Sequence, residues 1–245
     1  MILIIARREW AAAFQTLLGW FLLAASQLIL GWVFLQVLDG FSGLEPPQRG
    51  VGLNLTLSHN LFGSAAVLLL LAAPLLATRT LSSERREGTD QLLGAAPISI
   101  VAMLLGKLLG LALPLTLVTL LPLAMALSLI DIAPIDPGLF AAATLGLWLS
   151  GLLFCAVGLY AASLTAQPAL ATVIAYGILL LLSVVSQADQ LTAPQVSVLN
   201  WLSWNQHLFW FLAGAVRLSD LAYFGLATAL FVALAHRRLA NQRLG

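Results

Sequence analysis

Charged residues are scarce in this chain. Of its 245 residues, 9% are Asp, Glu, Lys or Arg and 61% are apolar, and the mean hydropathy is +1.00. A typical soluble domain is about 25% charged and about 45–50% apolar. This composition excludes a soluble enzyme, a nucleic-acid-binding protein and a disordered scaffold. It favours a single transmembrane domain over residues 1–245 whose main solvent is lipid.

Motifs for nucleotides, metals and disulfides are also missing. The single cysteine, Cys155, excludes an intrachain disulfide. No G-x-x-x-x-G-K-[ST] phosphate loop is present, because Gly106-Lys107 is followed by Leu108 inside an apolar run. The three histidines lie in three different segments and do not suggest one metal or haem site. We therefore expect no enzyme activity and no bound cofactor, and ATP with magnesium would have to bind another chain.

One short pattern leaves an intramembrane hydrolase as a remote alternative. Gly40-Phe41-Ser42-Gly43 resembles the G-x-S-G of intramembrane serine proteases. Such a serine needs a histidine at matching depth on a neighbouring span, and only His59 or His207 could supply it here. A proton or ion pump is disfavoured, because such pumps use carboxylates deep inside the membrane and no carboxylate is expected at that depth here.

Six stretches are apolar enough to cross a membrane, which takes roughly 20 residues. The charge-free stretch 137–188 would be about 78 Å long as one helix, so the polar turn Ser163–Pro168 is expected to divide it into two spans. We predict an all-α integral membrane protein with six transmembrane helices. The expected spans are Trp10–Leu38, Leu61–Ala77, Pro97–Leu121, Pro137 to about Ser163, Pro168–Ala188 and Leu218–Ala235.

Basic residues predict the orientation. With the N-terminus in the cytoplasm, only Arg49 and Arg217 of the 11 basic residues fall outside, which fits the positive-inside rule and makes both termini cytoplasmic. The first residues, about 1–12, carry Arg7, Arg8 and Trp10, which suit a short helix at the membrane interface. The apolar run that follows is too long for a cleaved signal peptide.

Two connecting segments are unusual. The inner segment 79–97 is polar and charged, and it is either a solvated hairpin that only fixes topology or a docking segment for another protein. The outer segment 188–216 holds Trp201, Trp204 and Trp210. It predicts a re-entrant or interfacial helical hairpin, because indole rings favour the membrane interface. Its role is either an ordinary aromatic belt or a gate.

Inside the spans, small residues recur at four-residue spacing and predict close helix contacts. These residues are Ala102, Gly106 and Gly110, and then Ala142, Gly146 and Ser150. Lys107 is the one charge expected well inside a span, away from its ends. Since it lies within about 10 residues of the inner boundary, we expect it to extend its ammonium to the interface, and the alternative is a functional role.

Several stretches resemble the ABC-2 type permeases, the membrane subunits of one class of ATP-binding cassette transporter. They are Ser58-His-Asn-Leu-Phe-Gly63, the run from Pro74 to Thr89 with its Glu-Arg-Arg-Glu-Gly-Thr segment, Ala96-Pro-Ile-Ser99 and Leu105-Gly-Lys107. The run from Leu208 to Phe224 is similar to the end of the gliding-motility permease branch. The resemblance covers nearly the whole chain, and Glu-Arg-Arg-x-Gly-Thr is its most specific part.

The resemblance implies a fold like that of type V exporters and a mode of action. The segment between spans two and three would be a coupling helix that docks on a separate ATPase through Arg79, Glu84, Arg85, Arg86, Glu87, Gly88 and Thr89. A second, smaller contact would be the turn with Ser163, Gln167 and Pro168. A second copy or a paralogue would complete the pathway in the bacterial cytoplasmic (inner) membrane.

The same resemblance bears on cargo and further partners. It implies an exporter, with membrane lipid and an auxiliary periplasmic subunit as further contacts, and no nucleic acid. Few fixed charges in the spans favour lipidic, amphipathic or drug-like cargo over ions. The alternative is a membrane anchor derived from such a transporter, which uses ATPase motion for assembly or mechanical work and moves no solute.

Overall fold

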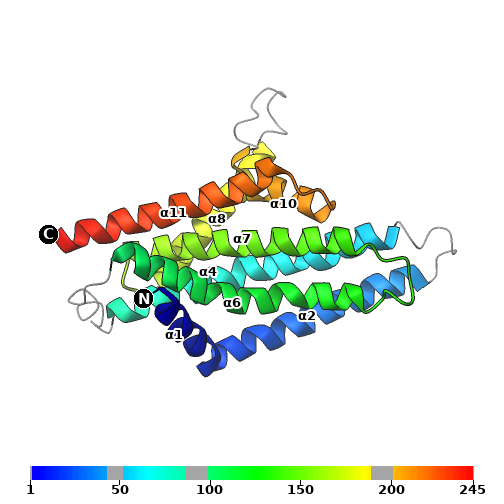
Figure 1. Ribbon diagram of the computed structural model, residues 1–245, viewed down its shortest axis with the longest axis horizontal. Coiled ribbons are helices and arrows are strands. Elements are labelled where there is room, and N and C mark those ends of the chain that lie inside the picture. The colour runs from blue at the N-terminus through cyan, green and yellow to red at the C-terminus, as the bar shows by residue number, and fades with distance from the viewer. Residues whose placement is uncertain (1, 43–51, 87–98, 189–200, 245) are drawn as a thin grey trace.

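The computed structural model describes residues 2–42, 52–86, 99–188 and 201–244 (Figure 1). The described part is helical and contains no strand. Its elements are α1 (Ile2–Gln15), α2 (Leu17–Ser42), the π-helix η1 (Leu57–Phe62), α4 (Gly63–Arg86), α6 (Ile100–Leu127), α7 (Pro137–Leu164), α8 (Pro168–Ala188), α10 (Trp204–Leu212) and α11 (Leu218–Leu244).

Five of the described helical stretches are long and apolar enough to cross a membrane, so the chain has the character of a multi-pass membrane protein. They are Gly19–Phe41, Gly52–Ser82, Ile100–Leu127, Pro137–Leu164 and Leu218–Gln242. The remaining predicted span falls on α8, whose apolar stretch Pro168–Val184 is shorter than these five. The turn that we expected to divide the charge-free stretch does lie between α7 and α8.

The first predicted span begins too early in the chain. Residues from Trp10 to Gln15 belong to α1, and α2 begins only at Leu17 after a break at Thr16. A Cβ added at Gly19 would lie 2.0 Å from the carbonyl oxygen of Ala13, so this corner requires glycine. The indole nitrogen of Trp20 also donates to the carbonyl of Phe14 at 2.8 Å. Hydropathy alone missed this corner because both of its sides are apolar.

Helices α2, α4, α6 and α7 run along the length of the molecule, and both termini lie at the same end (Figure 1). Helix α7 is at the centre and packs against α4, α6, α8, α10 and α11. Its glycines allow close approach: a Cβ at Gly158 would lie 2.8 Å from the Cβ of Ala77, and one at Gly146 would lie 2.5 Å from that of Phe211. The small-residue spacing therefore predicted real contacts on this helix.

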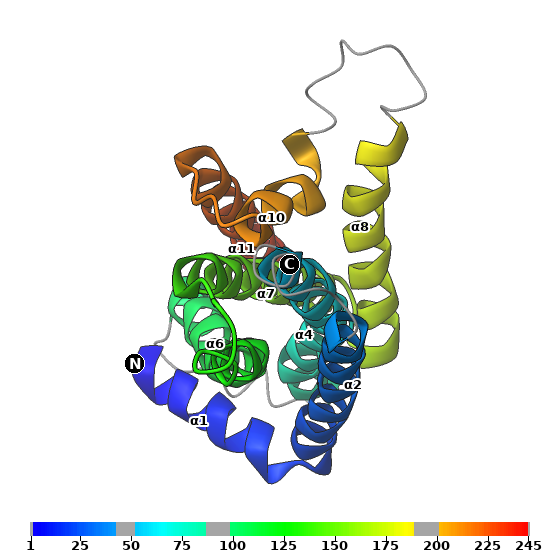
Figure 2. The same cartoon turned by 90° about the vertical axis from the view of Figure 1, so that its right-hand side faces the viewer.

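Helices α1 and α8 depart from the common direction. Figure 2 shows both from the side, whereas α4, α6 and α7 are seen nearly end-on. Helix α1 packs mainly against α6. Leu3, Ile4 and Trp10 of α1 are exposed. Helix α8 contacts α4 and α7, and Leu180, Leu181 and Val184 near its far end are exposed.

Candidate functional site

The end of α4 and the turn between α7 and α8 lie side by side at the end of the molecule that holds both termini. The hydroxyls of Thr78 and Thr172 are 2.7 Å apart and share a hydrogen bond. The hydroxyl of Ser82 donates to the carbonyl of Thr165 at 3.3 Å. The end of α4 and the turn that leads into α8 are therefore neighbours in space, although more than eighty residues separate these partners along the chain.

A cavity of about 1110 Å³ opens between these two segments. Arg79 lines it from α4, Gln167 and Pro168 line it from the turn, and Thr16 lines it from the corner between α1 and α2. Arg79 and Gln167 are both exposed. Three of the predicted coupling residues, Arg79, Gln167 and Pro168, thus line one cavity.

The other predicted coupling residues do not line this cavity. The backbones of Glu84, Arg85 and Arg86 form the last turn of α4, and Glu87, Gly88 and Thr89 lie outside the described residues. Ser163 is buried, and its hydroxyl donates to the carbonyl of Tyr160 at 2.6 Å. The second expected contact therefore centres on the exposed Gln167 and Pro168 side of the turn.

Lys107 lies beside the last turns of α4. Its environment corrects the expectation that its ammonium extends to the membrane interface. The residue is 1% exposed. Its ammonium donates to Oε1 of Glu9 at 2.8 Å and to the carbonyl of Thr80 at 2.8 Å. Glu9 is itself buried and belongs to α1, whereas Thr80 belongs to α4. One side chain of α6 thus joins three helices.

The small residues beside Lys107 explain how α1 comes close enough for this bond. A Cβ at Gly106 would lie 2.8 Å from the Cβ of Ile5, and one at Gly110 would lie 2.6 Å from the Cβ of Glu9. Any larger residue at either position would push α1 away from α6. Gly106 and Gly110 therefore act together with Lys107. The two glycines let α1 come close to α6, and at that short distance the ammonium of Lys107 can bond to Glu9.

A second buried polar cluster joins α10 to the first turns of α11. His207 of α10 contacts Oδ1 of Asp220 through Nδ1 at 2.7 Å and the carbonyl of Trp201 through Nε2 at 2.9 Å. A carbonyl only accepts, so Nε2 carries a proton. The ring of Tyr223 stacks on His207 with centroids 3.9 Å apart, and its hydroxyl donates to the carbonyl of Leu202 at 2.7 Å.

This cluster fixes the short helix α10 to the start of α11. Near it, the guanidinium of Arg217 lies 3.2 Å over the ring of Trp210, a cation–π contact. The segment 188–216 thus contains a packed helix in its described part, α10, which lies against α7, α8 and α11. Whether its role is a belt or a gate stays an open prediction, and residues 189–200 lie outside the described part.

Sequence reasoning missed two buried carboxylates, Glu9 and Asp220. The sequence pattern singled out neither of them. For Glu9 the sequence contained a usable signal, because a single lysine in an apolar run is expected to pair with a carboxylate. Each carboxylate is held by a partner within the protein, Glu9 by Lys107 and Asp220 by His207.

The hydrolase alternative gains no support from these positions. His207 is engaged by Asp220 and by the Trp201 carbonyl, and the ring of His59 lies against that of Phe209 with centroids 5.5 Å apart. Ser42 ends α2, and its side chain lies outside the described part. The described residues contain no group of three or more His, Cys, Asp or Glu that could hold a metal ion.

Comparison with known proteins adds no assignment: no protein-family model matches the sequence, and no curated protein is significantly similar to it.

Proposed function

We propose that this chain is the permease subunit of an ATP-binding cassette exporter of the ABC-2 type. In this proposal it binds a separate ATPase, forms the pathway with a second copy or a paralogue, and hydrolyses no nucleotide itself. The sequence resemblance suggests the class of protein, and the inner face of the bundle supplies the structural support.

The observation that carries the proposal is the meeting of Arg79 with Gln167 and Pro168 around one inner cavity. A subunit driven by an external ATPase needs a polar surface at its cytoplasmic end. That surface must also be attached to the spans, so that movement at the surface reaches the pathway. The hydrogen bonds from Ser82 to Thr165 and between Thr78 and Thr172 join the two segments into one such surface.

Lys107 supports the requirement that the cytoplasmic surface be attached to the spans. It holds the carbonyl of Thr80, which lies within the predicted coupling segment, and the carboxylate of Glu9 on the interfacial helix. A displacement of the end of α4 therefore cannot leave α1 and α6 in place without breaking the hydrogen bond from the Lys107 ammonium to the Thr80 carbonyl. We assign Lys107 the role of a positioning residue that makes the three helices move together.

The proposal includes a topology. Six spans, with α8 as the fifth, place both termini and the end of α4 in the cytoplasm of a bacterium. Arg7, Arg8, Arg79, Arg237 and Arg238 then lie on the inner side and Arg217 on the outer side, in agreement with the positive-inside rule. The apolar outer surface of α2, with Trp20, Phe21, Leu28 and Trp32 exposed, is suited to lipid or to the second subunit.

The test is purification of the full chain from its native membrane in mild detergent. We expect a subunit with a phosphate-loop motif to co-purify in stoichiometric amount and to hydrolyse ATP. The double variant Glu84→Lys/Arg86→Glu should reduce its recovery by about tenfold or more, because like charges brought together at an interface cost several kcal/mol. Arg238→Glu, an exposed reversal on α11 at the same end, is the matched control and should change little.

Two outcomes would count against the proposal. One is full recovery of the ATPase with the double variant. The other is reaction of a cysteine at position 89 with a membrane-impermeant maleimide from the outside of intact cells. Cys155 is fully buried, so the background of this labelling experiment should be low in the folded protein.

A further inference from the structure

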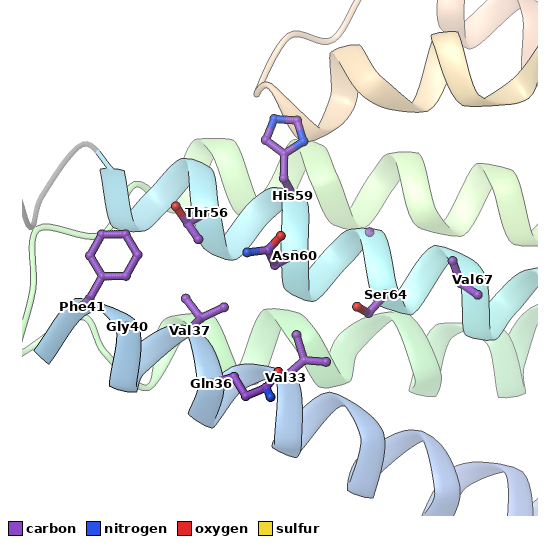
Figure 3. Close-up of a pocket in the computed structure, with 11 residues that line it drawn as sticks. Val33, Gln36, Val37, Gly40, Phe41, Thr56, His59, Asn60, Ser64 and Val67 are labelled. Atoms are coloured by element: carbon purple, nitrogen blue, oxygen red, sulfur yellow. The ribbon is translucent and has the colours of Figure 1, made fainter. Parts of the chain in front are cut away.

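A groove with polar walls lies between α2 and the π-helix η1 with the start of α4, away from the inner face (Figure 3). Its volume is about 640 Å³, which falls within the range of sites for small molecules, roughly 300–1,000 Å³. Gln36 lines it from α2, whereas Thr56, Asn60 and Ser64 line it from the opposite wall. Both walls belong to stretches that are able to cross a membrane.

The π-helix sets the composition of one wall. Leu57, Ser58, Leu61 and Phe62 of η1 are buried, whereas His59 and Asn60 between them are exposed. Ser58 is directed to the other side, where its hydroxyl donates to the carbonyl of Leu212 at the end of α10. The wider turn therefore presents polar side chains to the groove while the rest of η1 packs inward, and such π-turns are frequent at functional sites.

The amide and hydroxyl side chains that line this groove are not tied to other parts of the described chain. Among the described residues, the side chains of Gln36, Thr56, Asn60 and Ser64 make no hydrogen bond. Unpaired amides and hydroxyls are unfavourable against hydrocarbon. A set of four that converges from two helices is therefore better explained by a ligand that hydrogen-bonds to them than by contact with lipid tails.

Charge and depth narrow the class of ligand. None of the eleven residues that line the groove is Asp, Glu, Lys or Arg, so an anionic or cationic headgroup would find no fixed counter-charge. Gln36 lies five residues before the end of the apolar stretch Gly19–Phe41, which is about 7.5 Å along a helix. Val33 and Val67 continue the groove at its deeper end (Figure 3).

We propose that this groove binds an amphiphile from the outer leaflet whose headgroup is uncharged and rich in hydroxyl or amide groups, as in a glycosyl diacylglycerol. The headgroup lies between Gln36 and Asn60, and an acyl chain follows Val33 and Val67 toward the middle of the membrane. The direction toward the outer leaflet rests on the topology proposed above. The binding itself requires no ATPase, so it is tested separately from the coupling.

The experiment uses the full chain in nanodiscs of phosphatidylglycerol that contain one of two photoactivatable lipids at equal mole fraction. One probe is a glucosyl diacylglycerol and the other is a phosphatidylglycerol. We expect the glucosyl lipid to label peptides that cover residues 33–41 and 56–67 about threefold to tenfold more strongly, the ratio that one or two net hydrogen bonds provide.

The variant Gln36→Leu/Asn60→Leu should bring this ratio close to one. Both side chains are exposed, so leucine there should not disturb packing, and the helix content measured by circular dichroism checks this. Gln27→Leu, the same exchange at an exposed position of α2 outside the groove, should leave the ratio unchanged.

Three results would overturn the proposal. The first is equal labelling of the wild-type groove by both lipids. The second is an unchanged ratio in the double leucine variant. The third is efficient disulfide formation between two copies that each carry Gln36→Cys, unaffected by added glucosyl lipid, because the occupant of the groove would then be a second copy. None of these results depends on whether an ATPase binds at the inner face.

Discussion

The buried pair of Lys107 and Glu9 gives the sharpest test of the structure. At an effective dielectric constant of about 20, two charges 2.8 Å apart attract by roughly 6 kcal/mol, and desolvation opposes much of this. Removing one member leaves the other buried and unpaired, which typically costs about 3–5 kcal/mol. Replacing both by apolar residues of similar volume is often neutral or stabilising.

We therefore expect Lys107→Met and Glu9→Met each to lower the free energy of unfolding by about 3–5 kcal/mol. For a chain of this size, that corresponds to a fall of roughly 6–20 °C in the unfolding midpoint. The double variant Lys107→Met/Glu9→Met should recover most of the loss. The measurement is a double-mutant cycle of thermal unfolding in one detergent.

Arg8→Met is the matched control for this cycle. Arg8 lies 3.9 Å from Oε1 of Glu9 and its side chain is 61% exposed, so its loss should cost no more than about 1 kcal/mol. Additive effects in the double variant would refute the buried pair. If the pair also links the coupling segment to α1, the stable double variant should hydrolyse ATP with its partner subunit but couple this poorly to export.

Three further predictions concern helix packing, a helix cap and a buried hydrogen bond. Gly106→Leu should lower stability by about 1–3 kcal/mol through overpacking against α1, and an unchanged unfolding midpoint would show that α1 does not lie there. Asp136→Ala should cost about 1 kcal/mol and speed hydrogen exchange in the first turn of α7, because Oδ1 accepts from the backbone of Gly138 and Leu139; Asp136→Asn should retain the cap. Asp220→Asn should cost about 1–3 kcal/mol by weakening the bond to His207, with a smaller effect in a His207→Ala background.

The sequence predicted the elements whose signal is local. Long uncharged runs identified the five described helical stretches that are apolar enough to cross a membrane, because such a helix must be apolar over about 20 residues. The polar turn before Pro168 correctly divided α7 from α8, since proline cannot continue a helix from the preceding residues without losing a hydrogen bond. The spacing of Gly106 and Gly110 also indicated close helix contact, although not which helix would make it.

The surface around Arg79, Gln167 and Pro168 was predicted only in part. Charge in an apolar chain drew attention to segment 79–97, and the resemblance added the turn at Gln167 and Pro168. That these two segments meet around one cavity follows from the packing of α4 beside α7 and α8. The contact of this surface with an ATPase stays a prediction.

Composition and hydropathy alone thus predicted a multi-pass membrane protein and the positions of most of its helices. They could do so because the length of an apolar run depends only on residues that are neighbours in the sequence. The tertiary structure decided the rest. Glu9 and Lys107 are separated by 98 positions, and His207 meets Asp220 only through the fold of α10 onto α11. No one-dimensional pattern encodes such a meeting, since it depends on how close a glycine stripe lets two helices approach.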